Sequence, residues 1–251
     1  MRRTTTLAIS AVLLPATLAL SACSGSSTPA AKAAGTPSSA ATTTSADSTP
    51  TATASTQPTT PLLTGSQLKG FLAPASDFPS GFAPVAAETQ DTGTGYEQQS
   101  INPPPTPQCA LFDTNGIITI TGYSPVSFAQ GDYQSTTVPG EYAQEIDVFQ
   151  GTASQSLMTA LAAAAFVCPT YPDSETNTTA HVKQATTTVD GDPALVFTTT
   201  DSAWKGGLTI EAVRVGTAVV TVMASTQTND NGGPEAARLA GTIVANLAGK
   251  S

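Results

Sequence analysis

The sequence predicts an α+β domain, in which an antiparallel β-sheet is packed by two or three helices on one face and holds one disulfide. Three observations predict this class. Short strand-like segments follow one another between residues 182 and 223, separated by turns that contain glycine. Apolar stripes with helix start and stop signals occupy residues 152–168 and 233–249. Two cysteines, Cys109 and Cys168, lie within the same part of the chain.

The domain is expected to cover residues 62–250. Thr64 can cap a first helix with Gln67 as its capping-box partner, and Pro74 ends that helix. The following residues, 75–108, are rich in Pro, Gly and Thr and predict loop with room for one strand.

Two strands are expected next, over residues 125–134 and 141–150. In the second, Glu145 and Asp147 alternate with apolar residues. This alternation predicts a sheet with one solvent-exposed face, on which the two carboxylates would lie.

A helix is then expected from Thr152, with Gln155 as its capping-box partner, to Cys168, because Pro169 stops it. Cys168 follows Leu157 by three helical turns, so its thiol should face the core.

The C-terminal part predicts a β-meander and a final helix. Asp190-Gly191 is a strong hairpin-turn signal. Pro234 suits the first position of the helix, and Gly249 ends it. The expected strands cover residues 182–189, 194–200, 208–215 and 218–223.

Residues 1–22 have the pattern of a signal peptide, with Arg2 and Arg3 before an apolar segment at 7–20. The following Leu20-Ser21-Ala22-Cys23 resembles the lipobox of bacterial lipoproteins. That resemblance implies cleavage before Cys23, lipidation of its thiol and anchoring at the extracytoplasmic face of the cell membrane. An ordinary secretory signal is the alternative, and the export route, general secretory or twin-arginine, stays open.

Residues 24–61 consist almost wholly of Ser, Thr, Ala, Pro and Gly, which predicts a disordered tether after Cys23. The chain has 9 Lys+Arg and 18 Asp+Glu. Without Arg2 and Arg3, seven basic residues remain against 18 acidic ones, a net charge of −11. This charge excludes nucleic acid as a partner and leaves the lipid anchor as the link to the membrane.

Once Cys23 is assigned to the anchor, Cys109 and Cys168 are expected to form a disulfide, because an exported domain folds in an oxidising compartment. A pair of free buried thiols is the alternative. Two cysteines 59 residues apart and a single histidine, His181, do not have the spacing of a metal site, and we expect no cofactor.

Several short motifs resemble the extracellular sensor domains of mycobacterial PknH-type receptor kinases and related actinobacterial lipoproteins. They are Asp77-Phe78-Pro79-Ser80-Gly81-Phe82, Cys109, 145–149, Phe166-Val167-Cys168-Pro169, 190–193 and 213–216. The resemblance implies an antiparallel sheet with helices, structural disulfides and a cleft for an unidentified ligand. The chain departs from that family in having one cysteine pair instead of two, Phe166 where a Trp is expected, and no kinase domain or membrane-spanning helix.

No residue set specifies a reaction. The single His181 has no recognisable nucleophile elbow to accompany it, since Ser124 is followed by proline. Glu145 and Asp147 could form a carboxylate pair, but a solvated strand face is the simpler interpretation. Asp190 and Asp192 are turn formers, and no EF-hand spacing occurs.

We therefore predict a non-enzymatic, sensor-like binding module. Its ligand would be a small molecule, a lipid or a glycan, bound by the aromatic residues Trp204, Tyr133, Tyr142 and Phe149. Core packing is the alternative role for these four residues. A structural lipoprotein that binds an envelope protein is the second hypothesis, and an unrecognised hydrolase is the third.

Overall fold

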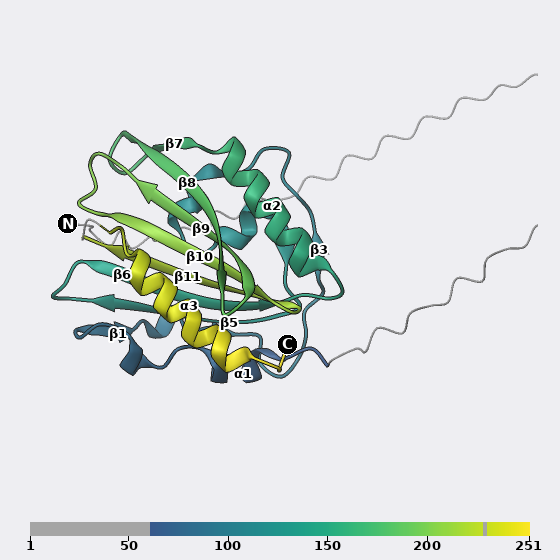
Figure 1. Cartoon of the computed structure of the whole chain (residues 1–251). Helices are drawn as coiled ribbons and strands as arrows, with labels where there is room; N and C mark the ends of the chain where they lie inside the picture. The colour runs from purple at the N-terminus through teal and green to yellow at the C-terminus, as the bar shows by residue number, and fades with distance from the viewer. Residues whose placement is uncertain (1–60, 228–229) are drawn as a thin grey trace, which may run out of the picture. The chain divides into compact units, whose positions relative to one another are not determined.

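The computed structural model describes residues 61–227 and 230–251. The predicted signal peptide, Cys23 and the predicted tether lie outside these residues. A nine-stranded antiparallel sheet forms the centre of the domain, with the order β1-β5-β6-β11-β10-β9-β8-β7 and with β2 also paired to β5 (Figure 1). Its strands are β1 Phe82–Pro84, β2 Gln90–Asp91, β5 Ser127–Ser135, β6 Gly140–Val148, β7 Thr170–Asp173, β8 Thr178–Val189, β9 Asp192–Thr200, β10 Gly207–Val215 and β11 Ala218–Thr226. A separate pair joins β3 Ser100–Ile101 to β4 Tyr123–Ser124.

The predicted meander is confirmed by β8 to β11. At the β8–β9 turn, Asp190 and Gly191 have φ values of 50° and 93°. Two successive positive φ angles are what a two-residue hairpin needs to match the twist of its strands. Strand β11 then pairs with β6 over nine residue pairs, which places β5 and β6 beside the meander in one sheet.

Apolar side chains fill both faces of the sheet. In β11, Val220 and Val222 belong to one hydrophobic cluster, whereas Val219 and Met223 belong to the other, as expected for side chains that alternate along a strand. Helix α3 (Gly233–Leu247) covers the first face over β10 and β11 (Figure 1). Helix α2 (Ala153–Val167) covers the second.

The α+β class, the antiparallel sheet and the single disulfide are thus confirmed, but the helices are divided between the two faces. The sequence could not show this, because an amphipathic stripe indicates that a helix is buried without indicating on which face. We call the two sides the α3 face and the α2 face.

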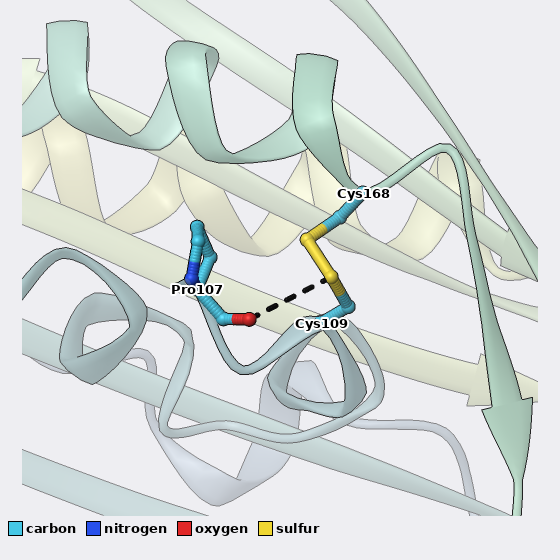
Figure 2. Close-up of a disulfide and its surroundings, with 3 residues drawn as sticks. All are labelled: Pro107, Cys109 and Cys168. Carbon is cyan, nitrogen blue, oxygen red and sulfur yellow. Dashed lines mark hydrogen bonds between the residues drawn. A yellow bond between two sulfur atoms is a disulfide. The ribbon is translucent and has the colours of Figure 1, made fainter. Parts of the chain in front are cut away.

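The disulfide joins Cys109 to Cys168, with Cα atoms 5.4 Å apart. Cys168 lies just after α2, and Cys109 opens the 3₁₀ helix η4 (Cys109–Asp113) (Figure 2). The carbonyl oxygen of Pro107 lies 3.8 Å from Sγ of Cys109. The bond therefore fastens η4 and the following η5 (Ile117–Thr121) to the end of α2, above the α2 face.

The segment before β5 is less regular than predicted. Helix α1 covers only Gly65–Leu68 and continues as the 3₁₀ helix η1 (Lys69–Phe71), although Gln67 Oε1 does accept the predicted bond from the Thr64 backbone N–H at 2.9 Å. Two further 3₁₀ turns follow, η2 (Ala75–Asp77) and η3 (Ala86–Glu88). None of the helices in the described ranges is long and apolar enough to cross a bilayer.

Candidate functional site

Carboxylates gather on the α2 face of β5 and β6. Glu145 and Asp147 alternate with Ile146 and Val148, which pack under α3, so both acids point to the opposite side. That side is not the solvated one that the sequence predicted. Asp147 is 1% exposed and Glu145 is half-buried, because α2, η4 and η5 cover this face.

Burial makes both groups hard to ionise, and the charge of Asp147 adds to this effect at Glu145. Desolvation raises the pKa of Asp147 to about 7, against which a hydrogen bond from Glu145 acts. Desolvation, followed by the charge of Asp147 and that of Asp132, raises the pKa of Glu145 well above its usual value. We assign the last proton of the pair to Glu145, which donates it to Asp147.

Asp132 on β5 extends the acidic group. It is 2% exposed, and its Oδ2 accepts a hydrogen bond from Nδ2 of Asn115 at 2.8 Å. Its Oδ1 is buried and has no hydrogen-bond partner among the described residues. Desolvation raises the pKa of Asp132 to about 7, the bond from Asn115 lowers it, and the charges of Glu88 and Glu141 raise it further.

Asn115 is held in place by the disulfide-bonded segment. It lies between η4 and η5, two residues after Asp113. Within η4, the Phe112 carbonyl accepts a hydrogen bond from Thr199 Oγ1 at 2.8 Å, and the Phe112 ring lies 5.2 Å from that of Phe197. The disulfide, this hydrogen bond and this ring contact together hold the side-chain amide of Asn115 above β5.

A hollow opens beside this amide. Glu145 and Thr221 supply polar groups to its lining, and Ile210 and Met223 supply apolar ones. Its empty space of about 170 Å³ includes open solvent, and the side chains that line it leave no room for even a water molecule. Small-molecule sites usually enclose roughly 300–1,000 Å³. In the described conformation the hollow is therefore closed, and a ligand could enter only if the side chains that line it moved apart.

The four aromatic residues predicted to bind ligand do not come together. Tyr133 and Tyr142 are paired across β5 and β6 under α3, where Tyr133 stacks on Phe78 at a centroid distance of 3.6 Å. Phe149 is fully buried in the core of the α2 face. Trp204 lies in the β9–β10 loop, where its Nε1–H donates to Oδ2 of Asp173, on the edge strand β7, at 3.0 Å.

These positions give Tyr133, Tyr142 and Phe149 packing roles, whereas Trp204 makes a hydrogen bond to the edge strand β7. Tyr133 and Tyr142 sit near one end of the strand order and the Trp204 contact at the other, so no one surface displays all four. His181 is exposed on β8, and Ser124 is exposed on β4, at distant places in the fold.

Sequence reasoning missed Asp132, Asn115 and Glu88. Asp132 could have been noticed, because it lies on the same side of its strand as Phe128. The prediction for that strand used its apolar residues only. No comparable signal marked Asn115, which lies in a loop whose position depends on the disulfide.

Comparison with known proteins identified the fold. No family model matches the chain, and no curated protein matches it either. Among solved structures, it is similar to the crystal structure of the extracellular domain of PknH from Mycobacterium tuberculosis, with 14% identity and a TM-score of 0.52. The match covers 75% of this chain and 98% of that domain. The chain shares the PknH extracellular-domain fold. At this sequence identity, the similarity establishes the fold alone.

Proposed function

We propose that this protein is a non-enzymatic, extracytoplasmic ligand-binding module of the sensor-like class, anchored to the membrane through lipid on Cys23. The observation that carries the proposal is the fold, which matches an extracellular domain over nearly all of that domain. The Cys109–Cys168 disulfide supports it, because such bonds persist in oxidising compartments. The lipobox at Leu20-Ser21-Ala22-Cys23 supports the anchor.

We propose the hollow on the α2 face as the binding site, which the side chains that line it must open to admit a ligand. Glu145 and Thr221 offer hydrogen-bonding oxygens beside the apolar side chains of Ile210 and Met223. Such a lining favours a small, polar ligand, or the polar end of a larger one, that carries hydrogen-bond donors. The site that we propose is therefore this hollow, and not the aromatic-lined cleft that was expected from the sequence.

Binding can be tested with the full chain purified in detergent. A panel of cell-envelope lipids and oligosaccharides would be screened by thermal shift. The test variant is Thr221→Val, which removes a hydroxyl from the hollow, and the control is Thr187→Val, which changes an exposed threonine on β8. A true ligand should stabilise the wild type and the control more than it stabilises Thr221→Val. Stabilisation that is equal in both variants, or absent for the whole panel, would count against this site.

The anchor is tested separately by membrane fractionation. Cys23→Ala should move the protein from the membrane pellet to the soluble or secreted fraction, because it removes the thiol that would carry the lipid anchor. Retention of Cys23→Ala in the pellet would exclude lipidation as the means of attachment.

A structural or partner-binding lipoprotein is the second candidate. It is favoured by the end of α2, where Phe166 is 85% exposed and Val167 is 59% exposed. Large exposed apolar side chains often mark contact surfaces. Cross-linking in cells from Phe166 should then yield one dominant protein adduct, whereas a spread of weak adducts would favour the ligand-binding module.

A further inference from the structure

A bulge in the sheet edge carries Glu88 onto the acidic region of the α2 face. Both β1 and β2 pair with β5, through Pro84 opposite Tyr133 and Gln90 opposite Gln130. A continuous ladder would need three fewer residues between these two pairings. The extra residues form η3, which ends at Glu88 and is held by a bond from the Val85 N–H to the Asp132 carbonyl at 2.8 Å.

Strand β6 supplies the third carboxylate. Asp132 faces Ala143 across the β5–β6 ladder, and Ala143 belongs to the core of the α2 face. Glu141 precedes Ala143 by two residues, so it projects from the same face and lies diagonally across from Asp132. Three elements, η3, β5 and β6, thus bring Glu88, Asp132 and Glu141 to one place.

The spacing of these carboxylates fits an ion. One oxygen from each of Glu88, Asp132 and Glu141 lies within 4.8 Å of the other two. Oxygens on opposite sides of a calcium ion are separated by about 4.6–5.2 Å, since each lies 2.3–2.6 Å from the ion.

A second observation points to a ligand here. Asp132 is 2% exposed and its Oδ1 is left without a hydrogen-bond donor, although Oδ2 is satisfied by Asn115. Buried polar atoms in folded proteins are nearly always paired, so this oxygen needs either a proton shared with the neighbouring Glu88 carboxyl or a bound cation. Glu88 and Glu141 are both half-buried, which leaves the cluster reachable from solvent.

We propose that Glu88, Asp132 and Glu141 form a calcium site. The donors are all carboxylate oxygens, which favour a hard cation over zinc or copper. Ca²⁺ tolerates irregular oxygen sets, whereas Mg²⁺ demands near-octahedral geometry at shorter distances. The ion would fasten the η3 bulge to β5 and β6. This inference goes beyond the proposed ligand-binding function and does not depend on it.

Calcium titration of the full chain in detergent, after chelator treatment, tests the proposal. Isothermal calorimetry should show one saturable site per chain, with a Kd of about 10⁻⁴–10⁻³ M, as in extracellular calcium modules. Glu88→Gln, a conservative change at a half-buried position, should weaken binding at least about tenfold. Asp132→Asn should do the same. Glu97→Gln alters an exposed glutamate outside the cluster and should leave the Kd unchanged.

Three results would overturn the proposal. One is the absence of saturable binding by the wild type up to ~10 mM Ca²⁺, ten times the weakest expected Kd, which would mean that the carboxylates share protons instead. Another is that Glu88→Gln and Glu97→Gln weaken calcium binding equally. The third is tighter binding of Mg²⁺ than of Ca²⁺. These measurements do not involve the ligand proposed to bind in the hollow. They therefore test the calcium site even if no such ligand is found.

Discussion

Replacing Asp147 by Asn should change how stability depends on pH. Asp147 is 1% exposed, its Oδ2 has no hydrogen-bond partner among the described residues, and burial raises its pKa from 3.8 to about 7. Between these two values the unfolded chain ionises the carboxyl while the folded chain keeps it protonated. The folded state then binds more protons, so the free energy of unfolding falls as pH rises from about 4 to about 7.

The size of this effect follows from the shift. A pKa difference of about three units corresponds to about 4 kcal/mol at 1.36 kcal/mol per unit. This cost is nearly absent at about pH 4 and fully present at about pH 8. Glu145 and Asp132, which lie on the same face, also have raised pKa values. Both therefore contribute to the fall in the free energy of unfolding with rising pH, and that contribution persists in the Asp147→Asn variant.

The measurement is urea unfolding of the full chain in detergent at several pH values from about 4.5 to 8.5, followed by circular dichroism and extrapolated linearly. Asp147→Asn should gain stability relative to the wild type by about 3 kcal/mol on going from the acidic to the alkaline end, because about 1 kcal/mol of the cost is already present at about pH 4.5. Any packing cost of the amide is the same at every pH and cancels in this difference.

Asp190→Asn is the matched control, because Asp190 is exposed at a turn where its φ of 50° suits either residue. It should follow the wild-type curve. If Asp147→Asn also follows that curve, Asp147 titrates alike in the folded and unfolded chains, and the argument from burial fails.

Two further predictions concern the scaffold. Replacing Cys109 and Cys168 together by Ser should lower the free energy of unfolding by about 4 kcal/mol, since the bond closes a loop with a sequence separation of 59; a loss below about 1 kcal/mol in urea unfolding would refute this. Trp204→Phe keeps a ring but removes the indole donor to the buried Asp173 carboxylate, and should cost about 1–3 kcal/mol. Unchanged thermal unfolding, measured by circular dichroism, would show that this bond does not secure the loop.

Local patterns predicted the elements well where the determinants were local. The Asp190-Gly191 turn, the α2 stripe and the C-terminal helix after Pro234 all depend on residues close in sequence, and all are present. The capping box expected at Thr152 is the exception, because no side-chain bond forms at that N-cap. The short edge strand β7, after Pro169, carried too weak a pattern to be predicted.

The candidate site could not be predicted in the same way. The alternation around Glu145 and Asp147 was recognised, but alternation alone does not reveal that a second helix covers the polar face. Glu88 reaches Asp132 through a three-residue bulge in the pairing with β5. Asn115 reaches it because η4 is held by the disulfide to α2 and by the contacts of Phe112 with β9. These juxtapositions depend on pairings between distant segments.

The two faces of the sheet differ in how many buried carboxylates they hold. The α3 face is packed by aliphatic side chains and the Phe78–Tyr133–Tyr142 aromatic group, and among the described residues it holds one buried carboxylate on β10, Glu211, whose pKa is raised by burial. The α2 face combines an apolar core with buried carboxylates that destabilise the folded state at neutral and alkaline pH. A protein selected for stability alone would place apolar residues at Asp132 and Asp147, so the acids on this face fit a binding role. A cation held by Asp132 would offset part of that cost, and the apo form should therefore lose stability with rising pH more steeply than the calcium-loaded form.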